Sequence, residues 1–451
     1  MSKIVIAGGG LCGALAGAYL ASNGYEIEVL ERRTDLRLGT AETGISINLA
    51  LSARGIKALG LIGLDEELKQ ISIPMPVRAL HQKDGTIYYV PYSGRSGEYI
   101  NSISRTGLNA LLLEKLSEFK NVKISFEAAC TQVDFKNKFV GYSSNGGHHS
   151  TSYDFLMGTD GAASVVRKNL YEQPFFSHTF QQEFLDYGYK ELHIDPLKDG
   201  GFAIEKNALH IWPRGHLMMI ALPNLDGSFT LTLFLPMKGE DSFETIDSGL
   251  GIKAYFEKHF NDATDLMPTL EQQYQANPIG HLGTIKCSPW SFNNVCIMGD
   301  AAHAITPFYG QGMNCAFEDM LILSELMKQR GGLSAEVLHE FQQNRKQDTD
   351  AIADLAIDNF YEMRDHTANP IFLKKRMIET ALEKTYPDYY SKYSMVTFRD
   401  DMSYHEAMTR GRKQDAWLMQ YAESNEFSLD NLNLIYNKLK DQLYQNKAMR
   451  F

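Results

Sequence analysis

The chain has 451 residues and a formal net charge of −11, with 44% hydrophobic and 22% charged residues. This composition is typical of a soluble globular protein of two or three domains, and the acidic balance argues against a nucleic-acid-binding surface. We expect neither a membrane span nor a signal peptide, because apolar runs are short and Met1 leads directly into a strand pattern. Five scattered cysteines without a C-x-x-C pair predict no disulfide framework and no metal site, and therefore a cytoplasmic protein.

The first element is a buried strand over residues 3–7, which the pattern Gly8-x-Gly10-x-x-Gly13 follows at once. A helical pattern then ends near residues 23–24, and a second strand over 26–30 places Glu31 at its end. This order is typical of a dinucleotide-binding turn, in which the glycines admit a pyrophosphate and the acid binds the ribose. The alternative is a glycine-rich turn that binds nothing, but all four parts of the pattern are present.

Two later segments repeat the order of strand, acid and glycine. Residues 155–161, FLMGTDG, are followed by a helix start, and the apolar run 295–298 leads to Gly299 and Asp300. The glycines of "PFYGQGMN" (307–314) would let the backbone approach a flat ring, and the positive end of the next helix would stabilise charge on a reduced flavin. Glu31 suits FAD or NAD equally, and these segments favour FAD.

The middle of the chain predicts strands over 207–213, 217–223 and 228–236, with Asp226-Gly227 as a hairpin turn. "SSNGGHHS" (143–150) is interpreted as a hairpin loop rather than a metal site. From about residue 333 the pattern is helical, and the tyrosine-rich stretch 386–393 interrupts it.

The three glycine-containing motifs, in this order, resemble those of the class A flavoprotein aromatic hydroxylases, which have the p-hydroxybenzoate hydroxylase fold. "SINLALSARG" (46–55), "YKEL" (189–192), "NALHIWPRG" (207–215) and "YSMVTF" (393–398) are similar to segments of the kynurenine 3-monooxygenase family in particular. The resemblance implies an α/β fold with an FAD-binding Rossmann-like domain, an inserted β-sheet substrate domain, and a helical C-terminal region that covers the active site. The expected boundaries are 1–70, 96–175 and 281–330 for the first, 71–95 and 176–280 for the second, and 331–451 for the third.

The resemblance also implies an activity: NADPH- and O2-dependent hydroxylation of L-kynurenine to 3-hydroxy-L-kynurenine, in tryptophan catabolism, with tightly bound FAD. The reaction would pass through a flavin C4a-hydroperoxide, so no catalytic side chain is assigned, and His303 is expected to be packed or hydrogen-bonded. Membrane-anchored members carry an apolar C-terminal helix, whereas residues 431–451 are rich in Lys, Gln and Asn, so we expect no membrane anchor.

Site residues follow from the resemblance, position by position. The amino-acid end of the substrate would be held by Arg78, Tyr92, Asn359 and Tyr393, and its ring side would be lined by Phe234, Pro307, Phe308 and Met363. The FAD contacts would be Gly8, Gly10, Gly13, Leu30, Glu31, Arg32, Arg33, Ala50, Arg105, Cys130, Thr159, Asp160, Asp300, Gly312, Met313 and Asn314.

Each substrate position also has a structural alternative. Arg78 could be a surface charge, Tyr92 a turn residue, Asn359 a helix-surface amide, and Phe234 and Met363 plain core. Among functions, a hydroxylase of another aromatic acid and a flavin-binding sensor without turnover stay open. A halogenase is disfavoured because the three tryptophans form no W-x-W pair.

Overall fold

The computed structural model describes residues 1–39, 48–174, 176–362 and 369–444. The chain divides into two compact units, the first made of Met1–Ser72, Ile103–Leu185 and His281–Ala353, and the second of Ile73–Ser102, Asp186–Gly280 and Asp354–Phe451. The sequence predicted a third region from residue 331 onward, whereas the helices after residue 354 group with the inserted strands. Helix α12 (Ala335–Tyr361) contributes residues up to Ala353 to the first unit and residues from Asp354 to the second.

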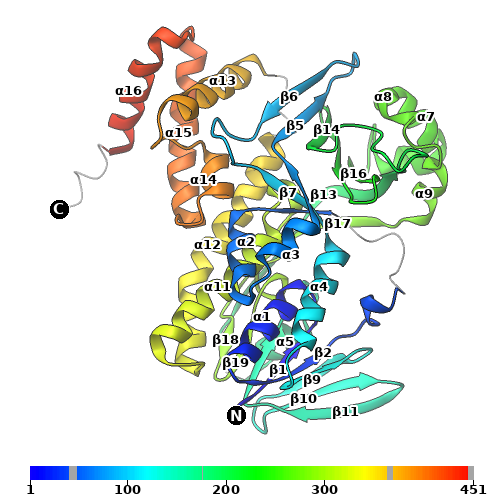
Figure 1. The fold of residues 1–451 in the computed structure, drawn as a ribbon, viewed down its shortest axis with the longest axis vertical. Coiled ribbons are helices and arrows are strands. Elements are labelled where there is room, and N and C mark those ends of the chain that lie inside the picture. Colours follow the sequence, from blue (N-terminus) through cyan, green and yellow to red (C-terminus); the bar gives the residue numbers. More distant parts are fainter. Residues whose placement is uncertain (40–47, 175, 363–368, 445–451) are drawn as a thin grey trace. The chain divides into compact units, whose positions relative to one another are not determined.

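A six-stranded mixed sheet forms the centre of the first unit (Figure 1). Its strands pair in parallel, apart from the antiparallel pair at one edge. The central strand, KIVIA, is apolar on both faces because both faces are covered, and its residues from Ile4 to Ala7 are fully buried. In spatial order the strands are β18 (Ser291–Phe292), β19 (Val295–Ile297), β12 (Phe155–Gly158), β1 (Lys3–Ala7), β2 (Glu26–Leu30) and β8 (Val122–Ser125).

Helix α1 (Leu11–Ser22) packs against α4 (Arg105–Ser117) and α11 (Gly312–Arg330). Its buried face is made largely of alanine and glycine, which allows close approach: a Cβ added at Gly17 would lie 3.0 Å from a methyl of Leu116. The other helices and helical turns of this unit are η1 (Leu36–Leu38), α2 (Ala53–Leu59), η2 (Gly60–Ile62), α3 (Asp65–Gln70), α5 (Val165–Tyr171), α10 (Asp300–His303) and η4 (Pro307–Tyr309).

A separate three-stranded sheet contains the predicted hairpin of residues 143–150. Its strands are β9 (Ala129–Asp134), β10 (Phe139–Ser144) and β11 (Gly147–Ser152), and the tight turn is Asn145-Gly146, both with positive φ. His148 and His149 are exposed neighbours on β11, so the hairpin interpretation is confirmed. A further three-stranded sheet has the order β3 (Asn48–Leu51), β7 (Ile100–Ser104) and β4 (Ser72–Met75); the chain leaves this unit within β4 and re-enters it within β7.

Glu28 on β2 is a buried carboxylate that links three strands. It accepts from Lys3, Lys123 and Thr151, at 2.6 to 2.8 Å. Burial works to raise the pKa of Glu28, but the two lysines and the hydroxyl lower it to about 2. A carboxyl with a depressed folded-state pKa contributes stability above its unfolded pKa and loses it as the pH falls.

We therefore expect Glu28→Gln to lower the stability of the first unit at neutral pH, by about 1–2 kcal/mol because the lysines are partly solvated. The difference from wild type should stay constant above pH ~5 and shrink between pH ~4.5 and ~2. Thermal melting as a function of pH measures it, with the exposed Glu26→Gln on the same strand as a control. A difference that persists unchanged at low pH would contradict this account.

A seven-stranded sheet forms the centre of the second unit, and the predicted strands 207–213, 217–223 and 228–236 are confirmed within it. Gly227 has a positive φ in the turn that joins the last two, as the Asp-Gly pair predicted. In spatial order the strands are β17 (Ile279–Ser288), β13 (Thr179–Ile194), β16 (Phe229–Pro236), β15 (Leu217–Pro223), β14 (Ala208–Arg214), β5 (Val77–His81) and β6 (Ile87–Pro91). One apolar core joins the four strands β13 to β16 to α6 (Phe243–Thr245), η3 (Ile246–Leu250), α7 (Ile252–His259), α8 (Asn261–Thr264) and α9 (Leu270–Ala276).

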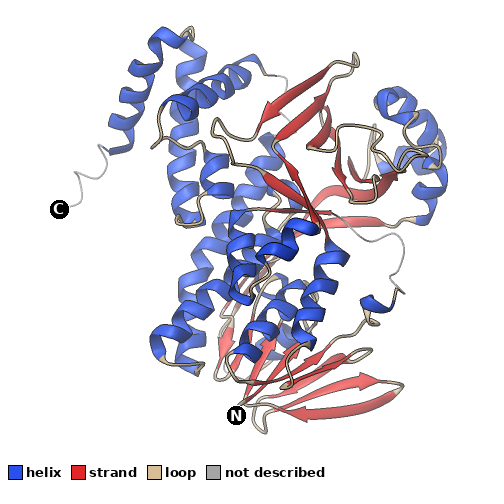
Figure 2. Ribbon diagram, in the orientation of Figure 1, coloured by secondary structure: helices blue, strands red, loops and turns tan. Residues whose placement is uncertain are grey.

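The described residues after 334 form only helices and their connections, as predicted (Figure 2). After α12 these are α13 (Pro370–Thr385), α14 (Lys392–Phe398), α15 (Tyr404–Ser424), the turn η6 (Leu429–Asn431) and α16 (Leu432–Tyr444). The tyrosine-rich stretch is the connection between α13 and α14. Over the described ranges, no helix combines the length and the apolar character that a bilayer span requires.

Candidate active site

The glycine turn between β1 and α1 has the backbone geometry of a dinucleotide site. Gly8 has a φ of +103°, and a Cβ at Gly13 would lie 1.9 Å from the Gly8 carbonyl oxygen, so neither position admits a side chain. Gly10 begins α1 in an extended conformation, and no side chain caps the first turn of that helix. The turn thus presents main-chain N–H groups and the positive helix end to a phosphate.

Glu31, at the end of β2, is buried and faces this turn. Its carboxylate accepts from the Gly9 main chain at 2.8 Å and from the main chain and Nε of Arg33, both at 2.9 Å. Burial alone would raise the pKa of Glu31, and the hydrogen bonds and charge of Arg33 outweigh it and lower the pKa. The side chain is therefore ionised at neutral pH and available to accept from ribose hydroxyls.

Glu31→Ala should weaken FAD binding by on the order of 1.5–3 kcal/mol, because charge-assisted hydrogen bonds are lost and the Gly9 N–H is left unpaired. Titration of the apoprotein with FAD measures the effect, and KM for the substrate should change little once FAD saturates the enzyme. The control is Glu26→Ala at the exposed start of the same strand. An unchanged FAD affinity would refute the role of Glu31.

The second motif, at the end of β12, supports the turn from the side. Thr159 donates to the carbonyls of Ala7 and Gly8 at 3.0 and 2.8 Å. Asp160 accepts from the main chain of Val165, the first residue of α5, at 2.7 Å, and Ser164 is the N-cap of that helix. The expected contact of Asp160 with FAD stays a prediction beside this observed structural role.

The third motif places Asp300 at the exposed start of α10, next to Gly299 with a φ of +58°. Further along, Asn314 is fully buried in the first turn of α11. Its side chain accepts from the Ser52 main chain at 3.0 Å and donates to the carbonyls of Ala50 and Gly310, both at 2.9 Å. The amide thus joins the end of β3 to the glycine loop. No side chain caps the start of α11 either, so its first main-chain N–H groups have no side-chain acceptor.

A buried charge network holds these motifs together. Asp319 accepts from the Gly299 main chain at 3.0 Å, from His303 at 2.6 Å and from Arg345 at 2.9 Å. Arg345 and Arg54 both pair with Glu318, at 2.7 and 2.6 Å. Burial works to lower the pKa of His303, but Asp319 raises it well above its usual range, so the ring is a fixed cation. The expectation that His303 is hydrogen-bonded is confirmed.

Sequence patterns indicated neither this network nor one further link. Arg167 donates to the carbonyls of Ala301 and Ala162 at 2.6 and 2.5 Å, and so connects the second motif to the third. The available signal was the acidic pair Glu318-Asp319 between apolar runs of α11, at 315–317 and 320–323, since buried carboxylates require buried cations.

These features fit FAD: two uncapped helix starts, glycines where a Cβ would collide, and an ionised acid beside the first turn. Of the remaining predicted contacts, Leu30 and Cys130 are buried or half-buried, Ala50 lies on β3, and Gly312 and Met313 begin α11. Burial raises the pKa of the Cys130 thiol to about 12, so it is no nucleophile. Arg32, Arg33 and Arg105 are exposed cations of the same unit. All of these stay predictions as FAD contacts.

In the second unit, the structure brings Arg78, Tyr92 and Tyr393 together from three separate segments. The Arg78 guanidinium lies over both phenol rings, at 4.2 and 4.4 Å, and the rings are 5.6 Å apart. Over the described residues Arg78 forms no ion pair with a carboxylate. Burial, together with Tyr393, raises the pKa of Tyr92 well above its usual range, so its hydroxyl is a neutral donor. We call this group the arginine clamp.

The other predicted substrate contacts are less clearly placed. Asn359 is half-buried near the end of α12, and Phe234 is 3% exposed on β16, where plain core packing also accounts for it. In the first unit, Pro307 is exposed and Phe308 is buried in η4. Met363 lies outside the described residues.

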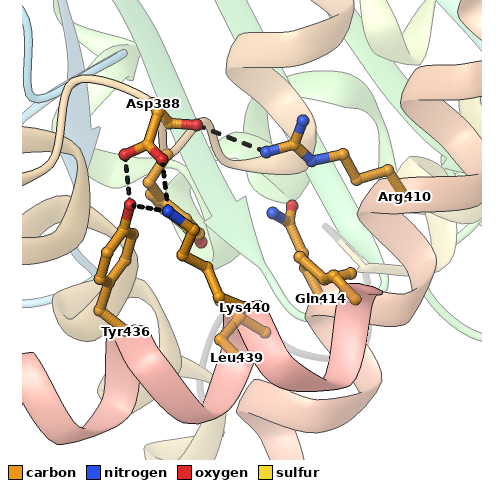
Figure 3. Close-up of a pocket in the computed structure, with 8 residues that line it drawn as sticks. Asp388, Arg410, Gln414, Tyr436, Leu439 and Lys440 are labelled. Carbon is orange, nitrogen blue, oxygen red and sulfur yellow. Dashed lines mark hydrogen bonds and ion pairs between the residues drawn. The ribbon is translucent and has the colours of Figure 1, made fainter. Parts of the chain in front are cut away.

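A small cavity lined by both polar and apolar side chains lies among the C-terminal helices (Figure 3). Gln414, 1% exposed, has neither amide atom hydrogen-bonded within the described ranges. The cavity volume of about 10 Å³ corresponds to roughly one water molecule, so it does not hold an aromatic substrate. Among all described residues, no group of His, Cys, Asp and Glu side chains could hold a metal ion.

Residues 1–356 match the family model described as FAD binding domain. The chain is 41% identical over 447 residues to "Kynurenine 3-monooxygenase" of Legionella pneumophila (strain Corby), covering 97% of this chain and 99% of the relative. It is 37% identical to the Dictyostelium discoideum protein of the same name, over 98% of both chains. Among solved structures, the tetrameric 2-methyl-3-hydroxypyridine-5-carboxylic acid oxygenase has a TM-score of 0.63 at 20% identity, covering 87% of this chain and 99% of that one, which establishes the fold alone.

Proposed function

Because the chain belongs to the kynurenine 3-monooxygenase family, we propose that it is a FAD-dependent monooxygenase that uses NADPH and O2 to convert L-kynurenine into 3-hydroxy-L-kynurenine. The observation that carries this proposal is the identity of 41% over 97% of the chain. When bound, FAD would supply the redox chemistry of the reaction, that is, hydride transfer from NADPH and activation of O2. All five cysteines are free thiols, which supports a reducing, cytoplasmic compartment.

The arginine clamp supports an amino-acid substrate. Within the described ranges the Arg78 guanidinium has no carboxylate partner, so it offers two parallel N–H donors to the substrate carboxylate. The two phenol rings restrict the guanidinium to one plane, so the substrate would be oriented as well as attracted. The ring amine of kynurenine activates the neighbouring carbon, and the remaining task of the protein is to orient that carbon and exclude water.

Two measurements on the purified protein test the proposal. Denaturation should release FAD rather than FMN, and NADPH oxidation should depend on L-kynurenine, with 3-hydroxy-L-kynurenine as the product. A flavin sensor would show no substrate-dependent rate, and a hydroxylase of another aromatic acid would leave kynurenine unchanged. Protein that cannot be reconstituted with FAD would overturn the proposal altogether.

A further inference from the structure

One carboxylate of α13 binds both segments that supply the rings of the arginine clamp. Glu383 Oε2 accepts from the Gly94 main chain at 3.1 Å, and Oε1 accepts from the Ser391 main chain at 2.8 Å. Gly94 follows Tyr92 by two residues, and Ser391 precedes Tyr393 by two. Glu383 is 5% exposed, so water does not compete for these hydrogen bonds.

The surrounding contacts make this connection stiff. A Cβ at Gly94 would lie 2.8 Å from the Lys384 main-chain nitrogen, so the Gly94 segment is in direct contact with α13. Arg95 donates to the carbonyls of Tyr386, Pro387 and Tyr389, and its guanidinium lies 3.8 Å from the ring centre of Tyr390.

The α13–α14 connection is also held from its other side. Asp388 accepts from Tyr436 and Lys440 of α16, and its main-chain carbonyl accepts from Arg410 of α15 (Figure 3). The Asp388 side chain is 58% exposed, so water weakens its hydrogen bonds and ion pair. The hydrogen bonds of the buried Glu383 are therefore the stronger restraint on this connection.

We propose that Glu383 is a positioning residue for substrate binding: it fixes the spacing of Tyr92 and Tyr393, and through them the plane of the Arg78 guanidinium. This inference rests on the proposed function, in which Arg78 binds the substrate carboxylate. A carboxylate suits the task because both oxygens accept. In Glu383→Gln one oxygen becomes an NH2 group that faces a main-chain N–H, so one of the two segments is released.

The test compares Glu383→Gln with wild type in steady-state kinetics. KM for L-kynurenine should rise by about 10- to 100-fold, as expected for loss of one buried hydrogen bond to a charged acceptor, while kcat and FAD affinity change less than about twofold. Glu383→Asp keeps the charge but has a shorter side chain, so its KM should lie between those of wild type and Glu383→Gln. It replaces Glu383→Gln in the test if that variant does not fold. Asp241→Asn is the matched control, since this carboxylate of the same unit pairs with Lys258 and His259, away from the clamp.

A double-mutant cycle separates positioning from general destabilisation. In an Arg78→Ala background, Glu383→Gln should change KM less than about twofold, because the guanidinium that it positions is gone. Equal effects in both backgrounds, an equal effect of Asp241→Asn, or an unchanged KM in folded Glu383 variants would overturn the inference while leaving the proposed function intact. An Arg78→Ala enzyme with wild-type KM would instead show that the clamp does not bind the substrate. The substrate role of Arg78 and the positioning role of Glu383 would then both be refuted.

Discussion

Arg78→Ala is expected to lower kcat/KM for L-kynurenine by roughly 30- to several-thousand-fold, or on the order of 2–5 kcal/mol. The substitution leaves the substrate carboxylate desolvated and without a matched charge between Tyr92 and Tyr393. The defect should appear chiefly in KM if the contact is equally strong in the ground and transition states. Steady-state kinetics with FAD-saturated enzyme measure it.

Arg78→Lys is the conservative control and should also be impaired. Lysine keeps the charge but has neither the planar donor pair nor the flat surface that lies over two aromatic rings. A kynurenine analogue with a neutral amide in place of the carboxylate completes the test. Wild type should discriminate strongly against the amide and Arg78→Ala far less, and equal discrimination by both would mean that another residue binds the acid.

Gly13→Ala is expected to abolish stable FAD binding. The new Cβ would lie 1.9 Å from the Gly8 carbonyl oxygen and 2.5 Å from Thr159 Oγ1, so α1 must move away from the turn that it closes. Neither neighbour is the tip of a flexible side chain free to rotate away: one is main chain, and the Thr159 hydroxyl is bound to Ala7 and Gly8. We expect colourless protein, or FAD affinity lowered by at least about 100-fold, consistent with a few kcal/mol of overpacking strain.

Gly17→Ala, one turn further along α1, is the matched control. Its Cβ would meet only methyl groups of Leu116 and Ile6, at 3.0 and 3.3 Å, which can shift by a few tenths of an ångström. FAD affinity should then stay close to wild type. A yellow Gly13→Ala protein with normal FAD affinity would show that the turn does not contact the cofactor as inferred.

Local sequence patterns determined the first unit to a large extent. The strand over residues 3–7, the glycine turn, helix α1 and the strand that ends at Glu31 all lie where the sequence predicts them. The reason is that a βαβ unit is specified by contacts close in sequence: apolar runs, glycines at fixed offsets and a helix start. The hairpin turns at Asn145-Gly146 and Asp226-Gly227 follow the same logic.

Local sequence patterns did not predict the arginine clamp, because its members are separated by up to 315 residues. Only the family resemblance connected them. No periodicity brings Arg78 on β5, Tyr92 after β6 and Tyr393 on α14 to one place. Packing of the second unit does so, and Glu383 binds the two tyrosine segments at distances that no spacing rule predicts.

The sequence by itself therefore determined the dinucleotide turn, the strands, the C-terminal helices and, through family resemblance, the chemistry. Only the tertiary structure decided which charges are buried together, as in the network of Asp319, His303 and Arg345, and which side chains share a site. The physical reason is that backbone conformation depends on neighbours a few residues away, whereas burial and pairing of charged groups depend on segments brought together from distant parts of the chain.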